Sequence, residues 1–298
     1  MSTADAAPAV TVPEPAVRER ARKRPRKGQS PWIWLAVVAI VVFCLFPFYW
    51  LINVSLKTGA DLSSSNLVPP HPSLKNYSSI FKNSDFTNGL KNSAIVAFSV
   101  TILALSFGSF AAYALARLKL RGKFVILGIV LSVTTFPQIA IAAPLFKLWT
   151  DSGLYNTRIG LIIPYLTFAL PLAIYILTSF FKEIPKDLEE AALVDGATHF
   201  QAFRKVVVPL AAPGLATAGI LTFIAAWNEF LLATTLTSSP SARTVPAAIA
   251  FFTGSTEFEV PLGTMSAASV VISIPLIILV LLFQKRIVAG LTAGAVKG

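Results

Sequence analysis

The sequence predicts an all-α membrane protein that crosses the bilayer six times. Of its 298 residues, 55% are hydrophobic and 13% are charged, whereas about 25% of the residues in a soluble domain are charged. Six stretches contain no Asp, Glu, Lys or Arg, and each exceeds the roughly 20 residues that a helix needs to cross the hydrocarbon core. These stretches are 28–56, 92–116, 124–146, 159–181, 206–228 and 260–284.

Each charge-free stretch is expected to form one transmembrane helix, because backbone polar groups in lipid must pair within their own segment. A barrel strand would have about ten residues of alternating hydrophobicity, and these stretches do not alternate. We therefore expect a six-helix domain over residues 31–284. A disordered, basic cytoplasmic arm (1–30) would precede it and a cytoplasmic tail (285–298) would follow it.

Lysine and arginine residues set the expected orientation. If the N-terminus is cytoplasmic, 18 of the 25 basic residues fall on inside segments and 7 on outside segments. An excess of basic residues on the cytoplasmic side is the usual topology signal, so both termini are expected inside. The net charge of +11 is then mostly a consequence of topology. Nucleic-acid binding is disfavoured because the basic residues are spread over several loops.

A polar segment, 182–209, separates the fourth and fifth expected spans. Pro185 suits the start of a helix, because its missing N–H would be unpaired there in any case. Gly196 suits a left-handed helix end. Thr198, with Gln201 three residues later, predicts a capping box for a second helix. The segment is therefore expected to form a helix, a glycine turn and another helix.

The second helix of this hairpin is expected to end near Pro209. It would place Phe200, Phe203 and Val207 on one face. On periodicity alone, an amphipathic hairpin lying on the membrane surface explains the segment as well as a docking element does.

A longer pattern across the same segment favours docking. It runs Glu190-Ala191-Ala192, three residues, Gly196, nine residues, Val206, one residue, Val208 and Pro209. The pattern resembles the cytoplasmic coupling loop of the membrane subunits of bacterial binding-protein-dependent ABC importers. Val206 and Val208 stand where isoleucine and leucine are usual, which is a mild departure.

Two further segments resemble the carbohydrate branch of that family. They are Trp227-Asn228-Glu229 and the chain ending at 290–298, and they are most similar to the second permease subunit of maltose-type and trehalose-type importers. The resemblance covers about residues 31–298. It implies a permease of the bacterial inner membrane that forms half of the translocation path for a di- or oligosaccharide, with trehalose favoured over maltose.

The resemblance also implies that the hairpin inserts into a cleft of a separate ATPase subunit and turns closure of the ATPase dimer into movement of the spans. ATP and Mg²⁺ would bind to that partner, and this chain is expected to bind no cofactor. Lys297 and Gly298 would also reach the ATPase. The residues assigned to the coupling loop are Glu190, Ala191, Ala192, Asp195, Gly196, Phe200, Phe203 and Pro209.

Two other partners follow from the resemblance: a second, homologous permease subunit that completes a heterodimer, and an extracytoplasmic solute-binding protein. The outer loop 238–262 is the expected contact for the binding protein. Its candidate contact residues are Thr253, Gly254, Ser255 and Glu257. Glu257 fits an ordinary solvated loop charge equally well.

Glu229 is the carboxylate expected within a span, where a charge costs about 2.5–3.5 kcal/mol on insertion scales. With Trp227 and Asn228 it is a candidate for the translocation path or a gate. An equally good interpretation pairs it with a neighbouring helix for structural reasons.

An enzyme is disfavoured, and no catalytic residue or metal site is expected. The sequence has no Gly-x4-Gly-Lys-Ser/Thr loop for a nucleotide. Asp195 and His199 are four residues apart, but Gly196 interrupts them and no third metal ligand is evident. The main alternative is a stand-alone secondary transporter or a channel. It would require no ATPase subunit.

Overall fold

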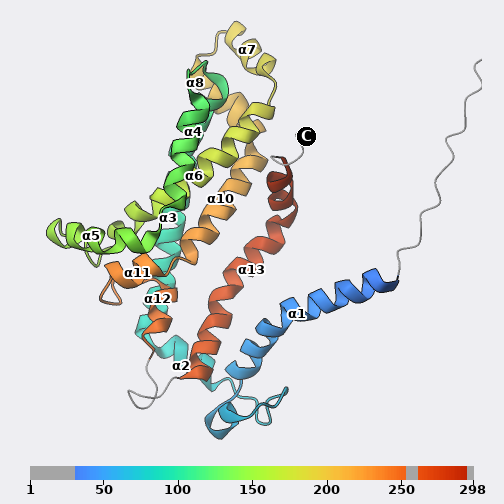
Figure 1. Cartoon of the computed structure of the whole chain (residues 1–298), viewed down its shortest axis with the longest axis vertical. Helices are drawn as coiled ribbons and strands as arrows, with labels where there is room; N and C mark the ends of the chain where they lie inside the picture. Colours follow the sequence, from blue (N-terminus) through green and yellow to red (C-terminus); the bar gives the residue numbers. More distant parts are fainter. Residues whose placement is uncertain (1–30, 253–260, 294–298) are drawn as a thin grey trace, which may run out of the picture. The chain divides into compact units, whose positions relative to one another are not determined.

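The computed structural model describes residues 31–252 and 261–293, and within them all regular structure is helical, as predicted (Figure 1). The chain forms two compact units, Met1–Leu45 and Phe46–Gly298. The longer helices are α1 (Pro31–Ser55), α3 (Ser84–Arg117), α6 (Arg158–Glu183), α10 (Ala212–Trp227) and α13 (Leu262–Ala293). The shorter ones are α2 (Lys75–Lys82), α4 (Lys123–Ser132), α5 (Gln138–Asp151), α7 (Lys186–Val194), α8 (His199–Ala202), α9 (Val208–Leu210), α11 (Leu231–Leu236) and α12 (Val245–Ala250).

Four helices of the described residues are long and apolar enough to cross a membrane, and the number is up to six if each of two bent pairs counts as one span. The four are α1, α3, α6 and α13. With each bent pair counted as one span, the six expected spans correspond to four continuous helices and two broken ones.

The third expected span is broken rather than continuous. α4 and the short helix η2 (Val133–Thr135) meet α5 at 83°. The break falls at Phe136, which is extended with φ −71° and ψ 130°. The cause is Pro137, because a proline disfavours the helical conformation of the residue before it.

The fifth expected span is bent at its start. The segment His199–Leu210 meets α10 at 76°. The second helix of the hairpin was predicted to end near Pro209, and the helical segment ends one residue later, at Leu210, before the chain turns at Ala211. Pro213, in the first turn of α10, has no N–H to continue the helical hydrogen bonds across this point.

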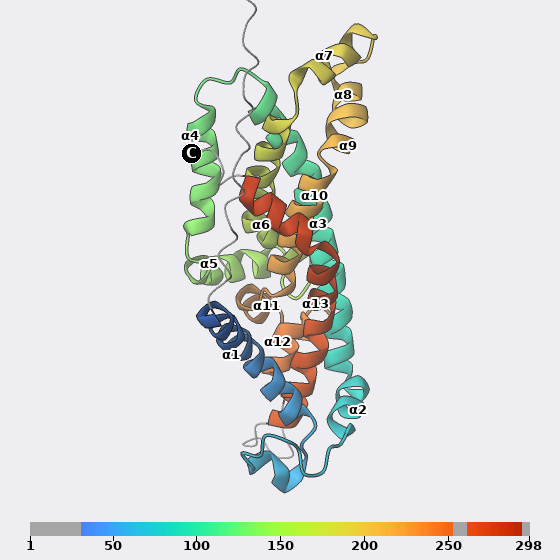
Figure 2. The same ribbon diagram turned by 90° about the vertical axis from the view of Figure 1, so that its right-hand side faces the viewer.

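α3, α6 and α10 pack side by side in the second unit (Figures 1 and 2). A Cβ on Gly108 of α3 would lie 3.1 Å from the Ala173 Cβ of α6, and a Cβ on Gly214 of α10 would lie 2.4 Å from the Phe180 ring. The glycines thus permit close backbone approach, which matters because lipid supplies no hydrophobic force between helices. The central buried cluster includes Val100, Leu161, Tyr165, Phe223 and Trp227.

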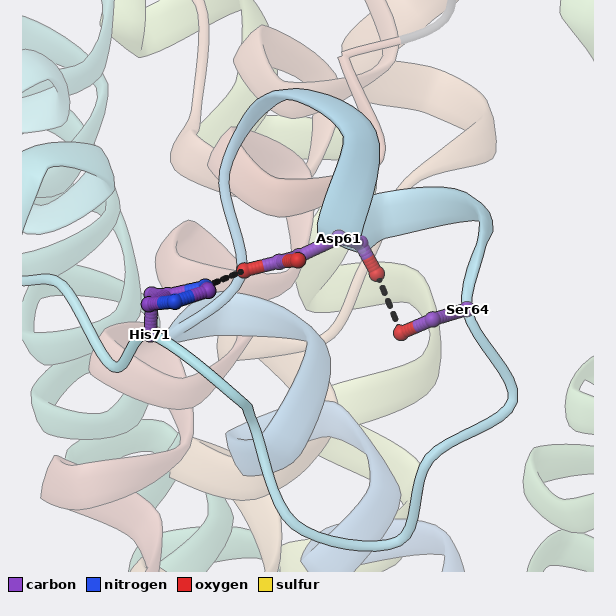
Figure 3. A network of polar contacts seen from close by, with 3 residues as sticks. All are labelled: Asp61, Ser64 and His71. Carbon is purple, nitrogen blue, oxygen red and sulfur yellow. Dashed lines mark hydrogen bonds and ion pairs between the residues drawn. The ribbon is translucent and has the colours of Figure 1, made fainter.

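The segment between α1 and α3 is more ordered than its Ser, Asn and Pro content suggests. It contains the short helix η1 (Gly59–Ser63) and α2, and α3 starts at Ser84, well before the charge-free stretch at 92. Lys57 is fully buried and donates to the carbonyls of Ser64 and Asn66, both at 2.9 Å. Figure 3 shows the same loop at Asp61, whose Oδ2 lies 3.2 Å from Nδ1 of the exposed His71.

At the C-terminal end, α13 continues to Ala293. The predicted tail boundary at residue 285 therefore falls inside this helix. The basic arm 1–30, the segment 253–260 and residues 294–298 lie outside the described residues.

Candidate functional site: the α7–α8 hairpin

The hairpin lies at one end of α3, α6 and α10 (Figures 1 and 2), and its local structure agrees with the prediction. α7 is followed by Gly196, whose φ is 88°. Residues with a Cβ rarely adopt this backbone conformation. The Gln201 side chain accepts from Thr198 N at 2.8 Å, and the Thr198 hydroxyl accepts from Gln201 N at 3.2 Å. This reciprocal capping box begins α8.

A buried ion pair fixes the base of the hairpin to α3. Glu189 of α7 is 8% exposed, and its Oε2 lies 3.0 Å from Arg117 Nε. The two atoms form an ion pair but not a hydrogen bond, because the N–H is not directed at the oxygen. The Tyr113 hydroxyl contacts the other carboxylate oxygen. Arg117 also donates from Nη2 to the Ile184 carbonyl at 3.0 Å, on the chain that leads into α7. One arginine thus holds both the start of the hairpin and its first helix.

Phe203 anchors the second half of the hairpin. It is 6% exposed, and its ring centroid lies 4.8 Å from that of Tyr113, 5.4 Å from that of Phe110 and 6.3 Å from that of Phe181. These partners belong to α3 and α6. Phe203 also opens a π-helical turn, η3 (Phe203–Val207), in which Val207 is buried as well. Phe203 was assigned to the coupling loop, and its side chain packs on α3 and α6 within this chain.

The outer face of the hairpin is exposed. Val194 is 87% exposed and Phe200 is 58% exposed. Glu190, Asp195 and Gly196 are exposed as well. Pro209 and Ala191 are also exposed, whereas Ala192 is half-buried. The predicted coupling residues other than Phe203 and Ala192 therefore lie on accessible surface. Asp195 and His199 lie on opposite sides of the Gly196 turn, not on one helix.

Sequence reasoning missed the Glu189–Arg117 pair. Asp187, Glu189 and Glu190 all suit the N-terminal turns of a helix, and the sequence contains no signal that selects the middle one for burial. Arg117 directly follows the charge-free stretch 92–116 and was expected only as one of the basic residues on an inside segment. The helical period places Glu189 and Glu190 about 100° apart, so only one of them faces α3.

Trp227, Asn228 and Glu229 have separate environments where α10 ends. Trp227 is buried and its indole Nε1 donates to the Ile272 carbonyl of α13 at 3.2 Å. Glu229 is 7% exposed, and its carboxylate accepts from Leu232 N at 2.8 Å and from Ala233 N at 3.1 Å. It therefore caps α11 and lies between helices rather than within one. Asn228 is exposed.

Comparison with known proteins identifies the family. The model of the family described as "Binding-protein-dependent transport system inner membrane component" matches residues 104–292, which include the whole hairpin. The chain belongs to this family. It is a membrane permease.

Relatives of the permease include transport proteins for sugars. It is 51% identical to the trehalose transport system permease protein SugB of Mycobacterium tuberculosis, over 89% of this chain and 97% of that one. It is 43% identical to the trehalose/maltose transport system permease protein MalG of Thermococcus litoralis, over 89% and 95%. Among solved structures, a bacterial ABC transporter for the import of alginate matches with a TM-score of 0.71 and 25% identity, over 88% of the permease and 99% of that chain.

Two groups of predicted site residues of the permease lie outside the described residues. Lys297 and Gly298 belong to 294–298, and Thr253, Gly254, Ser255 and Glu257 belong to 253–260. Their predicted contacts, with the ATPase and with the solute-binding protein, stay predictions.

Proposed function

We propose that this permease is one membrane subunit of an ATP-driven importer for a di- or oligosaccharide, with trehalose favoured over maltose, and that its α7–α8 hairpin docks on a separate ATPase subunit. One observation carries the proposal. The base of the hairpin is joined to α3 by the Arg117–Glu189 pair, while its outer face presents Val194 and Phe200 to solvent.

This arrangement suits the transmission of force. A push on the outer face reaches α3 through Glu189 and Arg117, and reaches α3 and α6 through the rings around Phe203. Close-packed interiors deform little, so the hairpin would move these helices as one body. ATP and Mg²⁺ would bind to the ATPase dimer, and this chain would bind no cofactor.

The complete transporter would contain a second permease subunit, two ATPase subunits and a solute-binding protein. The family description, which refers to a binding-protein-dependent system, supports a partner of the last kind. Lys297 and Gly298 would extend the ATPase contact, and the loop containing Thr253 and Glu257 would meet the binding protein.

The identity of the substrate is inferred from the substrates for which the relatives are named. Two of them are named for trehalose, and a relative in Agrobacterium fabrum that is 44% identical over 90% of this chain is named for sulfoquinovosyl glycerol. Trehalose and sulfoquinovosyl glycerol both contain a hexose unit joined by a glycosidic bond. Trehalose is favoured because it names the relative with 51% identity.

Reconstitution in vesicles tests the function. The permease, its partner permease, the ATPase and the binding protein are reconstituted, and uptake of labelled trehalose is measured with maltose as competitor. We expect uptake that requires ATP and every subunit. Uptake by the permease alone down a gradient would instead establish a secondary transporter or channel.

The docking surface is tested by the Val194→Asp variant, which places a charge on the outer face of the hairpin. We expect it to reduce co-purification of the ATPase about tenfold or more, because a charge without a partner in an apolar contact is strongly unfavourable. The matched control is Val68→Asp, at a valine that is 72% exposed in the loop between α1 and α2. Equal ATPase recovery with both variants would contradict the assignment of the hairpin.

A further inference from the structure

A hollow of about 360 Å³ lies at the break between α4 and α5. Such a volume is within the roughly 300–1,000 Å³ of small-molecule sites. Figure 2 shows α5 turning sharply away from the end of α4, and α6 contributes the remaining wall. The break lies at the centre of the apolar stretch 124–146. The hollow thus occurs where an uninterrupted helix would otherwise cross the bilayer.

The lining combines neutral polar groups with aromatic rings. Ser132, Thr134 and Thr167 supply hydroxyls, Gln138 supplies an amide, and Phe136 and Phe168 supply rings. The Thr134 hydroxyl donates to the Leu131 carbonyl at 2.7 Å and the Thr167 hydroxyl to the Pro164 carbonyl at 2.6 Å, which leaves their oxygens able to accept. Across the described chain, the Gln138 amide has no hydrogen-bond partner.

These groups are unsuited to lipid. Irregular backbone at membrane depth is tolerated only where it is buried in protein or lines a water-filled cavity, and Phe136 and Thr134 are both exposed in this chain. No lining residue of the hollow is charged, so a hydrated ion would find no counter-charge. A neutral polyhydroxyl molecule fits better, because its hydroxyls can pair with the hydroxyl and amide groups while its apolar ring faces pack on Phe136 and Phe168.

We propose that this hollow is a carbohydrate-contacting part of the translocation path, contributed by this subunit itself. The inference rests on the proposed function, because it takes the cargo to be a sugar. Gln138 would donate to and accept from sugar hydroxyls, Thr134 and Thr167 would accept, and Phe136 would pack against a pyranose face.

Kinetics of the reconstituted transporter test this role. We expect Gln138→Leu and Thr134→Val each to raise the KM for trehalose uptake about three- to tenfold, because each variant removes one neutral hydrogen bond to the sugar. The matched control is Thr150→Val on α5, because the Thr150 hydroxyl is likewise exposed and likewise donates to its own helix, at 2.8 Å to the Phe146 carbonyl. ATPase stimulation by the loaded binding protein and the KM for trehalose are both expected to stay near the wild-type values in Thr150→Val.

Thiol protection provides a direct second measurement. Cys44 is the single cysteine, so Cys44→Ser gives a background for Phe136→Cys and Thr150→Cys. During ATP-driven uptake, trehalose is expected to slow maleimide labelling severalfold for Phe136→Cys and to leave labelling of Thr150→Cys unchanged.

Two results would overturn the inference. One is an unchanged KM in Gln138→Leu and Thr134→Val together with no protection of Phe136→Cys. The other is a lower yield of the assembled complex with normal kinetics of what assembles, which would make the hollow a contact for the second permease. Either result leaves the proposed function intact if the wild-type complex imports trehalose. Failure of the wild-type complex would contradict the proposed function itself.

Discussion

The two bent helices of this permease have similar angles and opposite surroundings. The bend before α10, at 76°, is filled by protein: Ala211 is 1% exposed and lies in one buried cluster with Phe203, Val207 and Phe181. The bend between α4 and α5, at 83°, is open, with Phe136 58% exposed beside a hollow.

The difference separates two uses of a broken helix. A break whose inner side is packed against a buried cluster is expected to keep its angle when it is loaded, which suits a connection between a hairpin that docks and helices that move. An open break with polar lining leaves room for a molecule and has groups to bind it. Both breaks have a proline nearby, Pro213 and Pro137, so proline alone does not distinguish a rigid bend from a binding hollow.

The largest expected effect comes from emptying the filled bend. Phe203→Ala is expected to lower the free energy of unfolding by about 3–5 kcal/mol, as for other buried phenylalanines. Phe136→Ala at the open bend is expected to change it by less than about 0.5 kcal/mol, because an exposed side chain leaves no cavity. Thermal unfolding of the purified variants in detergent measures both values. Equal losses would remove the distinction between the bends.

The ion pair at the base of the hairpin is expected to have the next largest effect. Arg117→Met leaves Glu189 buried without its counter-charge and is expected to cost about 3 kcal/mol of stability. Combining it with Glu189→Met removes the stranded charge and should recover a large part of the loss. A double-mutant cycle on unfolding measures the coupling. Simple additivity of the two losses would indicate that the pair does not hold the hairpin.

The turn of the hairpin is expected to matter for coupling more than for stability. Gly196→Val forces a β-branched residue to a φ of 88° at a cost of about 1–2 kcal/mol. Gly153→Val is a matched control, because Gly153 has a φ of 72° and, like Gly196, has nothing within 4 Å of its Cβ position. Both variants should lose similar stability. Only Gly196→Val should lose ATP-driven uptake, and equal uptake by both would count against the hairpin as the coupling element.

The smallest effect is expected at Glu229. Its carboxylate accepts two backbone N–H groups of α11, and the glutamine of Glu229→Gln retains one acceptor oxygen. We expect a loss of about 0.5 kcal/mol, the low end for a capping residue, and uptake that is normal at every pH. Glu229→Leu, which removes both acceptors, should be less stable than Glu229→Gln. A transport defect in Glu229→Gln that follows pH would reinstate Glu229 as an ionised gate.

Much of the fold and part of the site were accessible from the sequence. Charge-free stretches located α1, α3, α6 and α13, and Gly196 with the Thr198–Gln201 capping box located the hairpin, because these signals are local. The burial of Phe203 was not accessible. Phe200 and Phe203 are both aromatic residues in the second half of the hairpin, and only the position of α3 and α6 buries one and leaves the other exposed.

The sequence by itself determined that the chain crosses a membrane as helices and carries a polar helix–turn–helix between its fourth and fifth spans. The physical reason is that the cost of charge in hydrocarbon and the backbone requirements of Gly196 act on short segments. The tertiary structure alone decided that Glu189 rather than Glu190 pairs with Arg117, and that one bend is filled and the other hollow. Those outcomes depend on which surfaces meet across many tens of residues, and such contacts have no signature in local spacing.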